Sequence, residues 1–156
     1  MELLNCTKDD FDQIITDIEE FWGSNRTLHI HHPMLINEFG NTAFVFKEGD
    51  KVCAYLFGFY SQTQPIAYAH IIAVRNNYRR LGLGRKLYEH FIKCAREKNC
   101  SKVKAITKAA NLESIAFHKS IGMELTGDGI IDGVPVVLDY SGPGEHRVVF
   151  IGNSYG

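Results

Sequence analysis

The sequence predicts an α/β fold of the α+β kind, with a mixed and mainly antiparallel sheet. The chain has 156 residues, 45% of them hydrophobic, enough to bury about two-thirds of its unfolded surface in one core. Two β-rich runs at 43–46 and 52–60 flank a short turn, as in a hairpin, and strand and helix patterns alternate over 66–121. No repeat, linker or low-complexity segment interrupts the pattern, so residues 1–156 are expected to form a single domain.

The N-terminal part is expected to hold one strand and two helices. Residues 2–6 form a short β-rich run, and Thr7 starts a capping signal. Apolar residues then recur at helical spacing until Gly23: Phe11, Ile14, Ile15, Ile18, Phe21 and Trp22. Pro33 suits a first helical turn and predicts a short helix over 34–39.

The remaining elements are expected to complete the sheet. Their order is a strand at 66–74, a helix at 83–98, a strand at 102–107, a helix at 111–121, and strands around 134–140 and 147–151. The helix at 83–98 has one apolar and one charged face, and Gly122 closes the next helix.

The net charge of −1 hides an asymmetry. Residues 75–108 carry eleven basic and two acidic residues, a balance of +9, while the rest of the chain carries six basic and sixteen acidic residues, a balance of −10. A concentrated basic segment indicates an anionic ligand. Nucleic acid is not the expected ligand, because the basic residues gather at one turn and one helix flank without a nucleic-acid motif.

No membrane association is expected, because no apolar run approaches the roughly 18 residues that a spanning helix needs. The first ten residues lack a basic region followed by a hydrophobic stretch, so no secretory signal is visible. A cytoplasmic location is expected.

The most informative segment is a glycine-containing turn between a strand and a helix, here called the glycine turn: Arg79, Arg80, Leu81, Gly82, Leu83, Gly84 and Arg85. Cations at a helix N-terminus are locally unfavourable, and a bound anion would resolve that conflict. A P-loop would need Gly-Lys-Ser/Thr, and a dinucleotide fingerprint would need a small residue where Leu87 stands. The turn therefore indicates a phosphate site of another kind.

Two segments together resemble the GNAT superfamily of N-acetyltransferases. Arg79-x-x-Gly82-x-Gly84 is similar to its acetyl-CoA motif, and Asn111 to Met123 is similar to its Asn-x-x-Ser/Ala-x-x-Phe-Tyr-x-x-x-Gly-Phe stretch. The resemblance implies helices on both faces of the sheet and a splayed central strand pair. It also implies acetyl-CoA as co-substrate, with the pyrophosphate on the backbone amides of residues 80–85 and the pantetheine along Ile72, Ala73 and Val74.

The resemblance implies catalytic roles as well. The backbone N–H of Val74 would serve the oxyanion, and Asn111 would reach the pantetheine. His118 stands where relatives commonly carry a tyrosine that protonates the thiolate, and we expect an imidazolium there to make this step pH-sensitive. The general base is open: His70, a water chain, or none if the amine arrives neutral.

The implied activity is acetyl transfer to a primary amine of a small molecule by direct attack in a ternary complex. Trp22, Arg26, Tyr68 and Tyr140 are candidate acceptor-binding residues. The alternatives are a non-catalytic acyl-CoA-binding sensor and a protein N-acetyltransferase. No metal is expected, since the loop histidines lack carboxylate or cysteine partners at ligand spacing. A homodimer through the late strands is left open.

Overall fold

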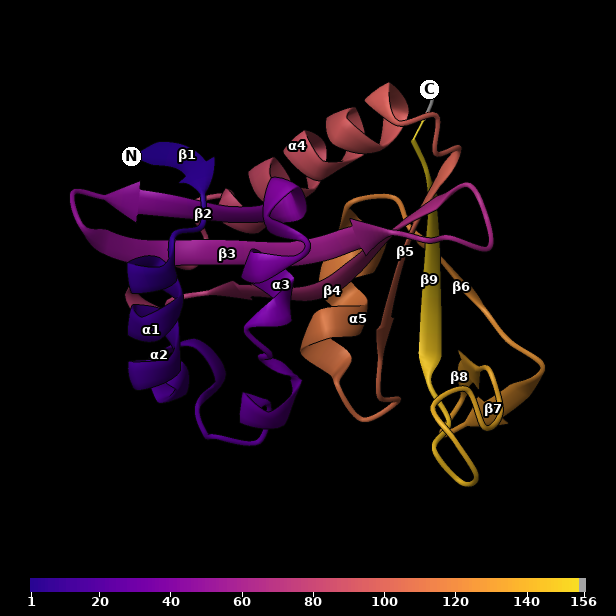
Figure 1. The fold of residues 1–156 in the computed structure, drawn as a ribbon. Coiled ribbons are helices and arrows are strands. Elements are labelled where there is room, and N and C mark those ends of the chain that lie inside the picture. Colours follow the sequence, from indigo (N-terminus) through magenta and orange to yellow (C-terminus); the bar gives the residue numbers. More distant parts are fainter. Residues whose placement is uncertain (155–156) are drawn as a thin grey trace. The chain divides into compact units, whose positions relative to one another are not determined.

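The computed structural model describes residues 1–154 (Figure 1). The chain forms two compact units. The first unit contains residues 1–59 and 69–94, and the second contains residues 60–68 and those from 95 onward. That the whole chain acts as a single domain stays a prediction. Within residues 1–154, no helix is long and apolar enough to cross a membrane.

Strands of the first unit form an antiparallel meander that leads to the glycine turn. β1 (Glu2–Asn5) pairs antiparallel with β2 (Ala43–Glu48), and β2 pairs antiparallel with β3 (Lys51–Tyr60). The β2–β3 hairpin turns at Gly49, whose φ of +59° favours glycine. β4 (Ile66–Val74) follows β3 in the sheet and ends as the sequence predicts.

The helices of the first unit are α1 (Lys8–Thr16), α2 (Ile18–Trp22), α3 (Met34–Asn37) and α4 (Leu83–Glu97), with single 3-10 turns at Leu28–Ile30, Gly40–Thr42 and Asn76–Tyr78. The predicted cap is present, because Thr7 and Asp10 form a reciprocal capping box. One difference is that the first predicted helix breaks at Asp17 into α1 and α2. The carboxylate of Asp17 is engaged by Arg75, a contact between residues far apart in sequence.

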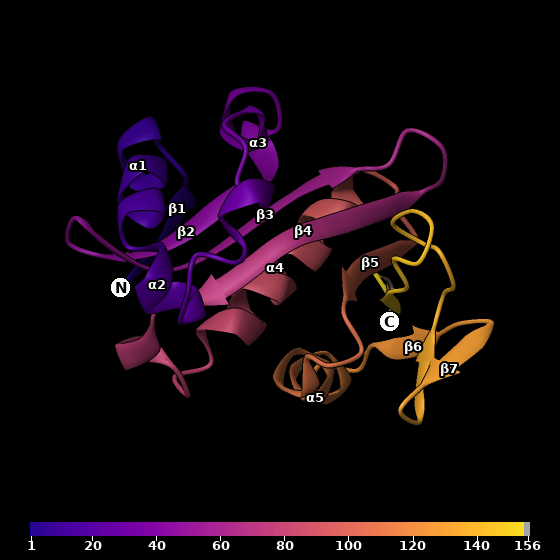
Figure 2. The same ribbon diagram turned by 90° about the horizontal axis from the view of Figure 1, so that it is seen from below.

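Packing on both sides of the strands buries an apolar core. Figure 2 shows α1 and α3 on one side of β2 and β3, and α4 on the other, which agrees with the predicted helices on both faces. The core on the α1 side contains these buried residues: Phe11, Ile14, Phe21, Leu35, Ala43, Val45, Val52, Tyr55, Phe57, Ile71 and Ala73. The last two come from β4, so this core supports the strand that leads into the glycine turn.

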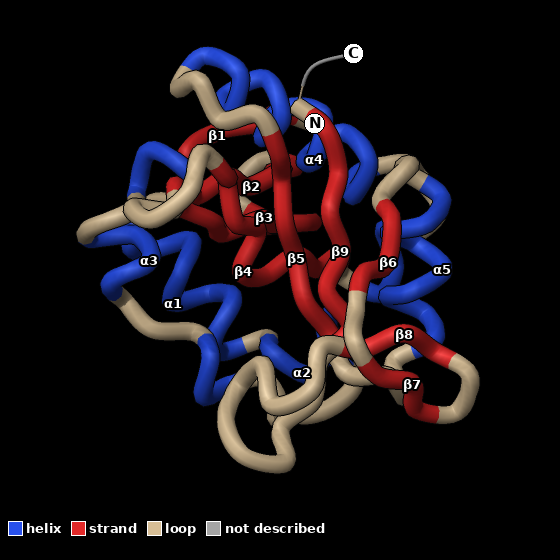
Figure 3. Tube along the Cα trace, turned by 90° about the vertical axis from the view of Figure 1, so that its right-hand side faces the viewer, coloured by secondary structure: helices blue, strands red, loops and turns tan. Residues whose placement is uncertain are grey.

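The second unit contains a parallel strand pair. The first residues of β4 pair parallel with β5 (Lys102–Thr107), in register from Ile66–Lys102 to Tyr68–Lys104. β9 (Val148–Asn153) lies between β5 and β6 (Glu124–Thr126) in Figure 3, and it pairs antiparallel with both. The parallel pair within mainly antiparallel pairing confirms the predicted fold class.

The remaining elements of this unit are α5 (Leu112–Ser120) and a separate hairpin of β7 (Gly129–Ile131) and β8 (Val134–Val136). The strand predicted at 134–140 is therefore shorter than expected. The left-handed φ of +56° at Asp139 turns the chain there. β6 and β7 were not predicted, because three residues are too few to show a strand period.

Candidate active site

The glycine turn presents the N-terminus of α4 at the surface. Helical hydrogen bonding begins at Lys86, whose N–H donates to the Gly82 carbonyl oxygen at 3.1 Å. The amides of Leu83, Gly84 and Arg85 therefore precede the first bond of α4, and amides in this position suit an anion. Gly82 has a φ of +77°, which a side chain would oppose.

The charges of the basic segment divide into two groups. Arg80, Arg85 and Lys86 are exposed around the turn, and Arg80 has a left-handed φ of +66°. Arg79 is exposed as well, but its guanidinium is bound to the protein, because its Nη2 donates to the Phe21 carbonyl oxygen at 3.0 Å. Arg75 is only 2% exposed. It was predicted to belong to the anion-binding segment, and this prediction is wrong because its guanidinium pairs with the carboxylates of Asp17 and Glu20.

Residues 72–74 form the last part of β4, with Ala73 buried and its two neighbours half-buried. Alternation along the strand places Ile72 and Val74 on the face opposite Ala73. The backbone N–H of Arg75 donates to the Cys53 carbonyl oxygen at 2.8 Å, which fixes the strand end against β3. The pantetheine and oxyanion roles of 72–74 stay predictions.

His70 lies on the same strand face as Ile72, two residues further back. Its Nε2 lies 3.1 Å from the Ile30 carbonyl oxygen. A carbonyl only accepts, so the ring proton is on Nε2. Burial lowers the pKa of His70, and the bond to Ile30 partly opposes this. A neutral imidazole at pH 7 is the form that a general base needs.

Trp22 belongs to a buried polar chain. Its indole Nε1–H donates to the Tyr55 hydroxyl at 2.8 Å. That hydroxyl lies 2.7 Å from Nε2 of His31, and His31 Nδ1 lies 2.8 Å from the Thr27 carbonyl oxygen. The His31 proton is therefore on Nδ1, and Tyr55 donates to Nε2. This chain holds the loop over 23–31 to β3.

Arg26 is exposed and folded back on α2. Its Nη1 donates to the Trp22 carbonyl oxygen and to the Ser24 hydroxyl, and its guanidinium lies 5.8 Å from the centre of the Trp22 ring. The predicted contact with an acceptor carboxylate would require this side chain to turn away from Trp22. That role stays a prediction.

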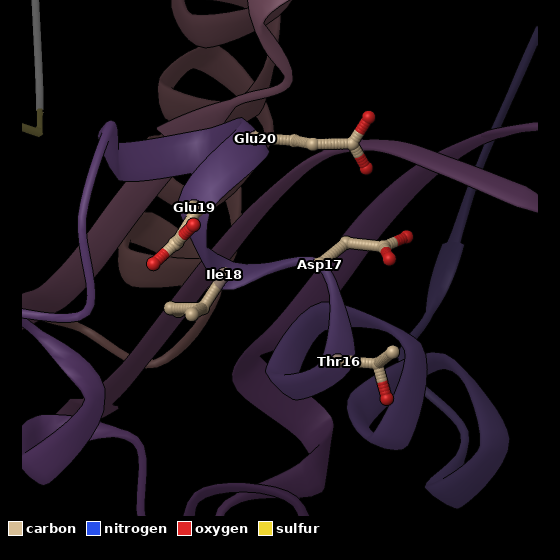
Figure 4. Close-up of a pocket in the computed structure, with 5 residues that line it drawn as sticks. All are labelled: Thr16, Asp17, Ile18, Glu19 and Glu20. Atoms are coloured by element: carbon tan, nitrogen blue, oxygen red, sulfur yellow. The ribbon is translucent and has the colours of Figure 1, made fainter.

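A pocket of about 390 Å³ lies at the junction of α1 and α2. Its lining consists of Thr16, Asp17, Ile18, Glu19 and Glu20 (Figure 4). The carboxylates of Asp17 and Glu20 extend to the same side, while Glu19 points another way (Figure 4). Three of the five lining residues are therefore acidic.

In the second unit, His118 lies on α5 and is only 3% exposed. Its ring stacks on Phe150 with centroids 4.2 Å apart, and Nδ1 donates to the Ser114 carbonyl oxygen at 2.7 Å. Burial lowers the pKa of His118 to about 4, with the Ser114 bond opposing the shift. An imidazolium is therefore scarce at neutral pH, and an acid role needs protonation at Nε2 against this cost.

The other predicted site residues of this unit are Asn111, which lies at the start of α5, and the tyrosines Tyr68 and Tyr140, which lie near Lys104. Asn111 caps α5, because its Oδ1 accepts from the Ser114 N–H at 3.1 Å. Lys104 Nζ lies 6.0 Å from the Tyr68 ring centre and 5.5 Å from that of Tyr140. Burial, followed by the neighbouring Tyr140, raises the pKa of Tyr68 to about 12. The two tyrosines thus share one cation.

The sequence analysis did not predict the roles of Asp17, Glu20 and Lys104, and it counted Arg75 among the anion-binding cations. Asp17 and Arg75 lie far apart in the sequence, and only the fold brings their charges together. The single signal for Arg75 was its position directly after an apolar strand. Within residues 1–154, no group of three His, Cys, Asp or Glu side chains could hold a metal ion.

Comparison with known proteins identifies the class. The sequence model described as the acetyltransferase (GNAT) family matches residues 9–123, which include the end of β4, the glycine turn and α5. The chain belongs to this family and is an acetyl-CoA-dependent N-acetyltransferase. The comparison with curated proteins finds no match.

Solved structures share the fold at low sequence identity. Ard1 from Thermoplasma volcanium has a TM-score of 0.73 and 18% identity over 97% of this chain and 96% of that one. The ribosomal-protein-S18-alanine N-acetyltransferase from Escherichia coli has a TM-score of 0.68 and 19% identity over 97% and 92%. The ribosomal-protein-alanine N-acetyltransferase from Brucella melitensis has a TM-score of 0.68 and 20% identity over 98% and 99%.

Proposed function

We propose that this enzyme transfers the acetyl group of acetyl-CoA to a primary amine of a small molecule, by direct attack of the amine in a ternary complex. The observation that carries the proposal is the glycine turn. Exposed cations surround the amides of a helix N-terminus at the end of a strand supported by the core. That arrangement fits a pyrophosphate.

Acetyl-CoA supplies a thioester, whose carbonyl carbon is the acetyl donor. Amides of residues 80–85, with Arg80 and Arg85, would hold the pyrophosphate, while residues 72–74 would align the pantetheine. The backbone N–H of Val74 would stabilise the negative charge that develops on the carbonyl oxygen. His70, neutral at pH 7, would take the proton from the attacking amine.

The acceptor is proposed to enter past the pocket at the α1–α2 junction. Carboxylates on its lining would attract the acceptor as an ammonium ion, which must lose a proton before attack. Because this attraction acts between charges near the surface, added salt is expected to raise the acceptor KM.

A second candidate acceptor is the N-terminal amine of a protein. It is favoured by the fold similarity to the two ribosomal-protein-alanine N-acetyltransferases from Escherichia coli and Brucella melitensis. The loop over 23–31 is mostly exposed or half-buried, and such a border could admit a peptide.

A thiol-release assay tests the proposal. Acetyl-CoA is incubated at several pH values with amino acids, polyamines and aminoglycosides, and in parallel with peptides that begin with alanine. Each acceptor is also supplied with its amine already acetylated, as the matched control. Thiol release with a small amine, and a mass increase of that amine by one acetyl group, supports the first candidate. Turnover of peptides alone supports the second. Binding of acetyl-CoA without turnover of any acceptor would indicate a sensor.

A further inference from the structure

Arg75 is a buried cation with partners on several elements. Its Nε donates to the Val52 carbonyl oxygen at 2.8 Å, its Nη1 donates to Asp17 at 3.0 Å and also to Glu20, and its Nη2 donates to Gln13 Oε1 at 3.2 Å. The guanidinium also lies 4.7 Å from the centre of the Phe21 ring. One side chain thus joins β3, α1, the α1–α2 junction and α2.

The same residue belongs to the end of β4. Arg75 directly follows Val74, and its backbone N–H bonds the Cys53 carbonyl oxygen at 2.8 Å. Two of its side-chain partners, Asp17 and Glu20, line the pocket at the α1–α2 junction. The guanidinium therefore connects the pocket wall to the strand position proposed to receive the thioester carbonyl.

Stability alone is a poor reason for this arrangement. The side chains of Asp17 and Glu20 are 31% and 54% exposed, so water could solvate both carboxylates without an arginine. Burying the guanidinium costs desolvation that an apolar residue would avoid. The planar guanidinium has five N–H donors, so it can hold several acceptors at fixed positions relative to one another.

We propose that Arg75 is a positioning residue for acetyl transfer. It holds the wall formed by Asp17 and Glu20 at a set place relative to the end of β4, so that an amine entering there meets the carbonyl at Val74. The inference rests on the proposed function, because it needs an acceptor that enters past this pocket. A displacement of about 1 Å can cost about 100-fold in rate.

The test compares Arg75→Lys with a matched control. Lysine keeps the charge but cannot reach four acceptors as a planar fork. Lys47→Met removes another enclosed ion pair, which joins β2 to α1, since Lys47 Nζ lies 2.8 Å from Asp10, whose side chain is 4% exposed. Calorimetric titration with acetyl-CoA gives the concentration of folded sites, which is used to calculate kcat. The KM values for acetyl-CoA and for the acceptor are measured in the same assays.

We expect Arg75→Lys to lower kcat about 10- to 100-fold, with the acetyl-CoA KM changed less than about threefold. Lys47→Met is expected to lower Tm and leave kcat per site unchanged. Equal kcat per site in the two variants, or a loss confined to the acetyl-CoA KM, would overturn the inference.

Glu20→Gln is the second variant, for use if Arg75→Lys does not fold. The Glu20 side chain is about half exposed, so this substitution is expected to leave the fold intact. We expect it to raise the acceptor KM about three- to tenfold at constant acetyl-CoA KM, and an unchanged acceptor KM would count against the inference. Wild-type enzyme is assayed in parallel. Wild type that acetylates no amine refutes the proposed function and the inference together, whereas active wild type with unaffected variants refutes the inference alone.

Discussion

Replacing Gly82 by alanine tests the glycine turn directly. Gly82 has a φ of +77°, and a Cβ built there meets no atom within 4 Å. The only penalty is therefore the backbone conformation, about 1–2 kcal/mol for an L-residue in the left-handed region. Because the turn is exposed, we expect its backbone in the variant to leave the left-handed conformation when no ligand is bound. Binding of acetyl-CoA would restore that conformation at the same free-energy cost, so its Kd should be about 5- to 30-fold weaker.

Gly49→Ala is the matched control. Gly49 has a φ of +59°, equally open surroundings, and a place in the β2–β3 hairpin. Calorimetric titration with acetyl-CoA and urea unfolding are carried out on both variants. Gly49→Ala is expected to lose about 1–2 kcal/mol of unfolding free energy with an unchanged Kd. An unchanged Kd for Gly82→Ala, with a stability loss like that of the control, would refute the role of this turn in binding.

Three further predictions concern the histidines. The pKa of His118 is lowered to about 4 in the fold, so the unfolded chain binds more protons between about pH 6.5 and 4, and stability falls as pH decreases through that range. Urea unfolding should show wild type losing about 2 kcal/mol more than His118→Phe between pH 7.5 and 5, and equal losses would contradict this. His118→Ala should lower kcat far more than it raises the acetyl-CoA KM, and an unchanged kcat would remove the acid role. The acidic limb of the kcat/KM profile should lie below pH 6.5 because burial lowers the pKa of His70, and a limb that persists in His70→Gln would exclude it as the base.

Local sequence patterns predicted the secondary structure correctly where the limits of an element depend only on its own residues. β4 and β5 begin and end at the predicted residues, because apolar runs with clear boundaries show their limits in the sequence. The cap at Thr7 and the stop at Gly23 were also predicted correctly. The break at Asp17 was not, since the helical spacing of apolar residues continues across it.

The candidate site was predictable in part for the same reason. The glycine turn follows from contiguous residues, so its strand, loop and helix could be recognised together. Arg75 lies at the edge of that segment and was counted with its exposed cations, although its partners come from residues 13–20 and from β3. The stacking of His118 on Phe150 could not be predicted from local sequence, because it joins α5 to a strand about thirty residues later.

The hydrogen bond between Trp22 and Tyr55 makes Trp22 an intrinsic fluorescence probe of this part of the enzyme. Trp22 is the only tryptophan of the chain, and it ends α2 directly beyond the pocket lining. Its indole N–H donates to a buried phenol and a guanidinium lies over its ring, so we expect its fluorescence to depend on both contacts. An acceptor that displaces Arg26 from the ring would change the emission without any label, and acceptors could be screened by fluorescence before a single acetyl group is transferred.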